Sequence, residues 1–310
     1  MKKVLKLIWK YFSTPFRGLF LLLSNVIKFI LRPIIKLRLF FTETSQLENN
    51  PFGEALGTVV EHPGSLLPHL DALRKHLFRS MGAVIVLSIL AFYFIKPIMS
   101  FLASPLPGGL DSLTAIDITE NIGAVMKVAL LCGFAAAIPY LAFEAYLFYA
   151  PAIKPSARIS NLLTIPLALV FFLTGVAFAY FIMLPVGLPF LFDFMGLNTQ
   201  PRPSSYFSFV TAILFWIGLF FEFPLIAYLM ARIGVLKADT LKSQWRLAII
   251  IMAILAATIT PTVDPLNMGL VMAPMLLLYI VAIMFTAIAY KRRQQTRSLK
   301  QQMEGDNADF

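Results

Sequence analysis

The sequence predicts an all-α, polytopic membrane protein with six transmembrane helices, preceded by a basic amphipathic N-terminal segment. Two observations support this fold class. Hydrophobic residues make up 59% of the 310 residues and charged residues only 14%, so the apolar surface exceeds what one water-soluble core can hide. Several apolar runs also reach or approach the roughly 20 residues that a helix needs to cross a hydrocarbon layer of about 30 Å.

The first 41 residues form a basic leader in which cationic and apolar side chains are interleaved. No acidic residue precedes Glu43. Such a mixture is typical of helices that lie on an anionic membrane surface, so the predicted partner is anionic lipid and not nucleic acid. Pro15 and Pro33 divide the leader into two or three short interfacial helices. A seventh span or a cleaved targeting peptide are the alternatives.

Behind the leader, the sequence divides into three further parts. Residues 42–66 form a polar linker rich in Asn, Gly and Pro, residues 67–290 form the six-span body, and residues 291–310 form a basic and polar tail. The predicted spans cover about 78–94, 122–146, 162–184, 207–230, 246–261 and 268–290. The apolar part of the fifth span would rise only roughly 20 Å as a helix, which predicts either a thinned bilayer around it or burial against a neighbour.

Basic residues near the span ends predict the orientation, because Lys and Arg are retained on the cytoplasmic side. The segment before the first span, the loops after the second and fourth spans, and the tail are basic and belong to one side. The other loops carry Lys96 and Arg202 together with five acidic residues: Asp111, Asp117, Glu120, Asp193 and Asp264. Both termini are therefore predicted to be cytoplasmic.

The sequence contains no pattern that indicates catalysis or metal binding. Cys132 is the single cysteine, which excludes an intrachain disulfide and a multi-thiolate metal site. The three histidines lie seven residues apart, whereas metal ligands on a helix usually lie three or four apart. Because neither a nucleophile with its base nor a Walker loop is present, we expect no enzymatic activity, no metal and no cofactor.

A series of short motifs runs through the predicted body. In order they are Pro68-His69-Leu70-Asp71-Ala72-Leu73-Arg74, Ser104-Pro105-Leu106, Tyr149-Ala150-Pro151-Ala152, Gly175-Val176-Ala177-Phe178-Ala179-Tyr180-Phe181, Phe221-Glu222-Phe223-Pro224 and Thr260-Pro261-Thr262-Val263-Asp264-Pro265. Each motif is weak alone, but their order and spacing resemble those of the TatC family, the core receptor subunits of the twin-arginine translocase.

The resemblance implies a function in protein export across the bacterial inner membrane. A TatC-like subunit would recognise twin-arginine precursor proteins, join TatA-type and TatB-type single-span proteins in an oligomeric complex, and draw on the proton-motive force without a cofactor. Two rival hypotheses are a divergent TatC-like scaffold that lacks ordinary twin-arginine recognition and a six-span solute transporter. The transporter would usually show inverted repeats, and the sequence has no such internal symmetry.

Glu222 is the polar residue to which we give most weight. A carboxylate near the middle of a membrane costs several kcal/mol and persists only with a partner or a role. No basic residue inside the apolar stretches of the fourth to sixth predicted spans could neutralise Glu222. The resemblance implies that Glu222, beside Pro224, contributes to a polar site for TatA-type and TatB-type helices. The structural alternative is a protonated glutamate that bonds a neighbouring helix.

Recognition of an arginine pair needs carboxylates, because guanidinium groups pair with them bidentately. The sequence departs from the TatC pattern at three acidic positions, which are Ala72, Ala157 and Ile280 here. The remaining candidates for signal-peptide binding are Asp71, Arg74, Glu144 and Phe148.

Each of these candidates also has a structural interpretation. Asp71 can form a local ion pair with Arg74, Glu144 can pair with Lys127, and Phe148 can be an interfacial aromatic residue. Two candidates fall on the predicted extracytoplasmic side, where Pro105 shapes a loop and Asp264 either has a family role or caps the sixth span.

Overall fold

The computed structural model describes residues 66–150, 162–192, 201–260 and 265–308, and every regular element within these residues is a helix. The chain forms two compact units, Met1–Ile85 and Val86–Phe310. The predicted leader lies outside the described residues, as does the predicted linker except for Leu66. The division of the chain into leader, linker, body and tail therefore stays a prediction.

The first span lies in helix α3 (Leu66–Tyr93). This helix begins well before the predicted position 78, because it includes the whole motif from Pro68 to Arg74. A second helix, α4 (Ile95–Ala103), follows at once and was not predicted. The short 3₁₀ helix η2 (Gly109–Ser112) comes next. Gly108 and Gly109 adopt positive φ angles of 89° and 62°, which a glycine backbone accepts without the steric cost of a Cβ atom.

The second and third spans are long helices. Helix α5 (Ile118–Tyr149) starts at Asp117, whose Oδ1 accepts a hydrogen bond from the Thr119 amide at 3.2 Å. The third span consists of α7 (Thr164–Phe178), the π-helical turn η4 (Ala179–Met183) and α8 (Leu184–Phe192).

The fourth span is divided into α9 (Pro203–Phe221) and α10 (Phe223–Ile233). Short helix α11 (Ala238–Ser243) then leads into α12 (Trp245–Ile259). Helix α13 (Pro265–Ala308) contains the sixth span and continues without a break through most of the predicted tail.

These helices confirm the predicted fold class. Five helical stretches in the described part of the chain are long and apolar enough to cross a membrane: Leu70–Tyr93, Thr119–Tyr149, Thr164–Pro189, Pro203–Ile233 and Asn267–Lys291. Helix α12 corresponds to the predicted fifth span and is the shorter apolar helix, with 15 residues and a rise of roughly 22 Å.

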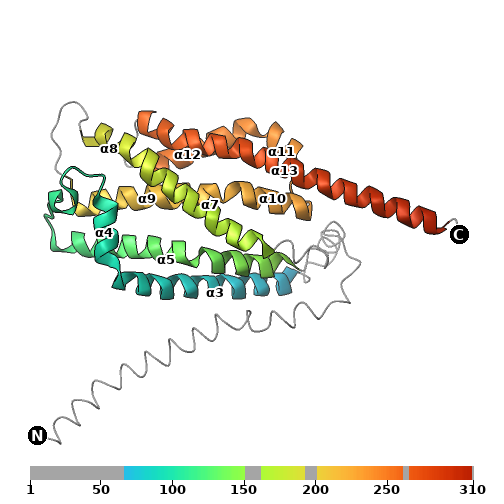
Figure 1. Ribbon diagram of the computed structural model, residues 1–310, viewed down its shortest axis with the longest axis horizontal. Coiled ribbons are helices and arrows are strands. Elements are labelled where there is room, and N and C mark those ends of the chain that lie inside the picture. Colours follow the sequence, from blue (N-terminus) through green and yellow to red (C-terminus); the bar gives the residue numbers. More distant parts are fainter. Residues whose placement is uncertain (1–65, 151–161, 193–200, 261–264, 309–310) are drawn as a thin grey trace, which may run out of the picture. The chain divides into compact units, whose positions relative to one another are not determined.

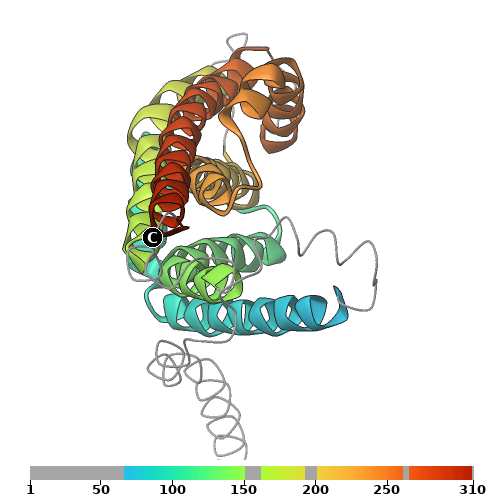
Figure 2. The same ribbon diagram turned by 90° about the vertical axis from the view of Figure 1, so that its right-hand side faces the viewer.

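Helix α9 lies at the centre of the unit Val86–Phe310. It packs against α5, α7, α12 and α13, and its inward side chains Phe207, Val210, Ile213, Leu214 and Ile217 are at most 2% exposed. Figure 1 shows α7 crossing α9 obliquely, with α10 continuing in the direction of α9. Helix α13 packs along α10 and α12, as can be followed from the second direction in Figure 2.

Two tyrosines from different spans hold the C-terminal end of α4. The Tyr180 hydroxyl donates a hydrogen bond to the Phe101 carbonyl at 2.6 Å, and the Tyr206 hydroxyl donates one to the Leu102 carbonyl at 2.7 Å. These carbonyls belong to the last turn of α4, where helix carbonyls run short of intrahelical donors, although the Phe101 carbonyl also accepts from the Ser104 amide at 3.1 Å. The two phenols therefore take the place of a helix cap and fasten α4 to η4 and α9.

We predict that removing both hydroxyls loosens α4. Each of the changes Tyr180→Phe and Tyr206→Phe should lower the free energy of unfolding by about 1 kcal/mol, because each removes a hydrogen bond between helices at the end of α4. Thermal unfolding of the purified protein in detergent measures this loss. The change Tyr290→Phe, on α13, is the matched control, and equal unfolding of all variants would contradict the assignment.

Candidate functional site

Glu222 lies at the point where the fourth span is interrupted. Pro224 has no amide hydrogen, so it cannot donate to the Phe220 carbonyl and a regular helix cannot continue through this turn. The Glu222 amide instead donates to the Leu219 carbonyl at 3.1 Å, and the Ile226 amide donates to the Glu222 carbonyl at 2.9 Å, which restarts the helix. The Phe-Glu-Phe-Pro motif therefore places an acidic side chain at a break within an apolar helix.

The carboxyl group of Glu222 is buried and incompletely satisfied. The residue is 7% exposed, and its Oε1 atom has no hydrogen-bond partner among the described residues. The backbone of Phe172 in α7 lies close to the carboxyl group. No ion pair joins Glu222 to a basic residue in the described part of the chain. An unsatisfied buried polar atom costs about 1–3 kcal/mol, so it needs an explanation outside the packing of this chain.

A close helix crossing fixes the position of Glu222 relative to α7. Gly218, one turn before Glu222, lies against the Phe172 ring, and an added Cβ atom at Gly218 would come within 2.8 Å of that ring. An added Cβ atom at Gly175 would come within 2.9 Å of the Gly218 Cα atom. The two glycines therefore allow α7 and α9 to approach more closely than larger residues permit.

A stripe of α10 leads outward from Glu222. Ile226 and Met230 follow at intervals of four residues and are 48% and 37% exposed, so Glu222 lies at the buried end of an exposed apolar stripe. On the other side of α10, Phe223 stacks on Tyr279 of α13 at 6.3 Å between ring centroids, and Pro224 is buried. Helix α10 is thus anchored on one side and open on the other.

The predicted pair of Asp71 and Arg74 is wrong. Asp71 Oδ2 lies 2.6 Å from Lys75 Nζ, one helical turn away, and the Arg74 guanidinium lies over the Phe78 ring at 5.5 Å. An acidic residue four positions before a lysine has the favoured spacing for such a pair on a helix. Because both side chains of the pair are more than half exposed, the pair contributes little stability and opens at small cost.

Glu144 and Lys127, which the sequence offers as an alternative pair, do not contact each other. Glu144 is 1% exposed and accepts a hydrogen bond from the Tyr140 hydroxyl at 2.5 Å, whereas Lys127 Nζ lies 2.5 Å from Ser208 Oγ in α9. Glu144 and Lys127 are separated by roughly 25 Å along α5. Glu144 therefore belongs to the helix-bundle interior and is not presented to an incoming peptide.

The other predicted site residues have different surroundings. Phe148 is 41% exposed in the last turn of α5, and Ile280 is 60% exposed on α13. Pro105 lies two residues after the last residue of α4. Asp264 and Ala157 lie outside the described residues, and Ala72 is half-buried in α3.

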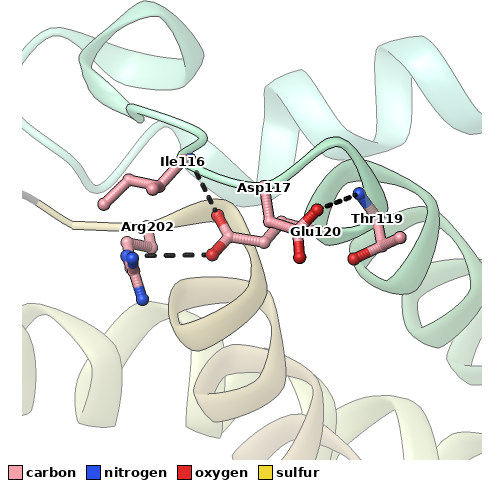
Figure 3. A network of polar contacts seen from close by, with 5 residues as sticks. All are labelled: Ile116, Asp117, Thr119, Glu120 and Arg202. Atoms are coloured by element: carbon pink, nitrogen blue, oxygen red, sulfur yellow. Dashed lines mark hydrogen bonds and ion pairs between the residues drawn. The ribbon is translucent and has the colours of Figure 1, made fainter.

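Sequence reasoning missed an ion pair that joins the beginnings of the second and fourth spans. Figure 3 shows Glu120 accepting a hydrogen bond from the Ile116 amide at 3.3 Å and lying 3.7 Å from the Arg202 guanidinium. The Thr114 amide also donates to the Pro201 carbonyl at 3.3 Å. The sequence shows Glu120 and Arg202 near the starts of two apolar runs, but it contains no signal that these two residues form a pair.

Together, the helices and Glu222 define a class of protein: a multi-pass membrane protein with an unsatisfied carboxyl group inside its helix bundle. The described residues contain no cluster of three or more His, Cys, Asp or Glu that could hold a metal ion. Comparison with known proteins then narrows the class.

The chain belongs to the TatC family, since residues 68–274 match the family described as Sec-independent protein translocase protein (TatC). It is 32% identical to the TatC protein of Carboxydothermus hydrogenoformans over 72% of this chain and 93% of the relative. It is 30% identical to TatCd of Bacillus subtilis over 74% of this chain and 94% of the relative. The protein is therefore a protein-transport component of the membrane and not an enzyme, as predicted.

A solved structure agrees with this assignment. The crystal structure of the twin-arginine translocase receptor TatC superposes with a TM-score of 0.64 at 30% identity, and the match covers 71% of this chain and 99% of the receptor. The family match and the structural likeness confirm the resemblance that the motifs indicated.

Proposed function

We propose that this chain is the receptor subunit of a twin-arginine translocase. It receives precursor proteins with a twin-arginine signal at its cytoplasmic face and recruits TatA-type and TatB-type helices at Glu222, so that folded proteins can be exported. The single observation that carries the recruitment step is the buried Glu222 Oε1 atom without a hydrogen-bond partner in the described residues. The name of the matched crystal structure, a twin-arginine translocase receptor, supports the receptor role.

The stripe on α10 suggests how a partner helix engages. A single-span helix lying along Met230 and Ile226 would bury apolar surface there and reach Glu222 at the end of the stripe. A donor group on the partner would then satisfy Oε1 inside a water-free region, where a hydrogen bond is worth more than at the surface. Helices without a donor at that depth would leave the carboxyl group unsatisfied and bind less well.

The location and orientation follow from the same proposal. The chain lies in the bacterial inner membrane with both termini in the cytoplasm, as the basic loops indicate. The leader lies on anionic lipid at the cytoplasmic surface, and the chain works within an oligomeric complex.

For the signal peptide, the geometry favours Asp71 and Phe148 over Glu144. Asp71 is exposed and held only by a surface ion pair, so a guanidinium group can replace Lys75 at little cost. Phe148 is exposed for apolar contact with the segment that follows the arginines. Arg74 is the remaining candidate on α3, where it is exposed and its guanidinium group lies over the Phe78 ring of the same helix.

A second candidate is a TatC-like scaffold without ordinary twin-arginine recognition. It is favoured by the loss of the acidic position at Ala72 and by the burial of Glu144, which leave Asp71 as the exposed carboxylate among the described candidates. Such a scaffold would retain the fold and the Glu222 site.

Photo-crosslinking separates the two candidates. With a photoreactive amino acid at position 148 of the full-length protein, which leaves Asp71 in place, we expect an Arg-Arg signal peptide to be labelled at least about tenfold more strongly than its Lys-Lys counterpart, because lysine cannot form the bidentate pair. Labelling from position 144 should be weak for both peptides. Equal labelling of both peptides from position 148 would instead establish the scaffold without arginine-pair recognition.

A further inference from the structure

Lys127 is a cation within an apolar span, and the function proposed above does not use it. The residue is exposed on α5, where its neighbours Met126 and Leu130 are 57% and 56% exposed apolar side chains. An exposed side chain in this part of a membrane-spanning helix faces lipid, where a charged group is costly unless it meets an acceptor.

The hydrogen bonds of Lys127 are incomplete. Its ammonium group has three donors, and its Nζ atom donates to Ser208 Oγ of α9 at 2.5 Å. The Ser208 hydroxyl in turn donates to the Ser204 carbonyl. No acidic side chain in the described part of the chain forms an ion pair with Lys127. Among the described residues, two of its three donors meet no acceptor, so they can bind a group from outside the chain.

The contact with Ser208 draws the ammonium group toward the ends of the helices. The Lys127 backbone lies roughly 14 Å below the first residue of α5, but Ser208 lies only roughly 8 Å below the first residue of α9. The ion pair between Glu120 and Arg202 and the bond from the Thr114 amide to the Pro201 carbonyl hold the beginnings of both helices together. The long lysine side chain thus reaches the depth of lipid headgroups while its aliphatic part stays in the hydrocarbon.

We propose that Lys127 and Ser208 form a binding site for the phosphate group of an anionic phospholipid, in the leaflet on the side where α5 and α9 begin. The Lys127 ammonium group supplies the positive charge that a phosphate needs. The Ser208 hydroxyl accepts a hydrogen bond from this ammonium group and so fixes its position. Glu120, on the same face of α5, does not compete, because Arg202 and the Ile116 amide occupy its two oxygen atoms. This site is separate from the predicted contact of the leader with lipid. The leader is predicted on the cytoplasmic side of the membrane, whereas α5 and α9 begin on the opposite side.

Native mass spectrometry of the full-length protein tests this site. The protein is purified, delipidated in detergent and titrated with dioleoylphosphatidylglycerol. We expect the change Lys127→Gln to weaken apparent lipid binding about tenfold and Ser208→Ala to weaken it about threefold, whereas Lys127→Arg should retain most of it. The change Lys96→Gln, at an exposed lysine of α4, is the control and should leave binding unchanged. Unchanged binding by Lys127→Gln would overturn the proposal.

Two further measurements distinguish other occupants. Inorganic phosphate at millimolar concentration should not displace the lipid, and displacement would show a soluble-anion site instead. If Lys127→Gln binds the lipid normally but loses co-purifying TatA-type or TatB-type protein, the cation belongs to a protein interface and the lipid proposal is wrong. Neither result depends on Glu222 or on signal recognition, so the proposed function is tested independently.

Discussion

Export of a folded twin-arginine reporter should fall at least about tenfold when Glu222 is replaced by alanine in a strain that has no other copy of the gene. The substitution removes the group that we expect to bind partner helices. It also removes an unsatisfied buried atom, which offsets part of the cost of the cavity that the smaller side chain leaves. Co-purification of TatA-type and TatB-type proteins should fall in parallel. The amount of exported reporter is measured in the deletion strain after complementation with each variant.

The controls separate binding from folding. The change Glu222→Gln keeps the shape and one acceptor oxygen, so we expect it to retain part of the activity, and Glu222→Asp should lose more because its shorter side chain withdraws the carboxyl group from the stripe. The change Thr258→Val, at an exposed position of α12, serves as a matched control. If Glu222→Ala left both complex assembly and export unchanged, the recruitment site would have to lie elsewhere.

The change Gly175→Val is expected to cause a large loss of stability. Even the Cβ atom of the new side chain would meet the Phe221 ring at 2.8 Å and the Gly218 Cα atom at 2.9 Å, and a backbone atom cannot move aside as a side chain does. Separating α7 from α9 should lower the free energy of unfolding by about 1–3 kcal/mol or prevent accumulation of the protein. Thermal unfolding in detergent and the amount of protein in the membrane measure the effect.

Other glycines in the same bundle provide the comparison. An added Cβ atom at Gly123 or Gly269 meets nothing within 4 Å, so Gly123→Val and Gly269→Val should unfold at nearly the temperature of the unsubstituted protein. The milder change Gly175→Ala should fall between these and Gly175→Val. A Gly175→Val protein as stable as the Gly269→Val protein would show that the helix crossing tolerates a wider separation.

Hydropathy alone predicted where the spans lie, because the need for a long apolar run is a local property of the sequence. The short fifth span and the position of Glu222 could be predicted for the same reason. Pro224 indicated the helix break, because a proline cannot donate a hydrogen bond to the carbonyl one helical turn before it.

Contacts between distant segments could not be predicted. The pairs Glu120–Arg202 and Lys127–Ser208 join residues about 80 positions apart, and their partners depend on how α5 and α9 pack. Helix α4 was missed because nine residues are too few to be recognised as a span and the tyrosines that hold it come from other helices. The choice of Lys75 over Arg74 could have been made from the sequence, because a four-residue spacing with the acid first is the better one.

The unbroken course of α13 has a practical consequence for experiments on this chain. Residues 291–308 continue the sixth span as a stiff rod of roughly 27 Å, so a fluorophore or gold label fixed near Ala308 would be carried at a set distance from Tyr290 and would not swing about a flexible joint. Its motion would then report rotation and tilt of the membrane-embedded bundle during transport, which makes this end of the chain a natural handle for single-molecule measurements.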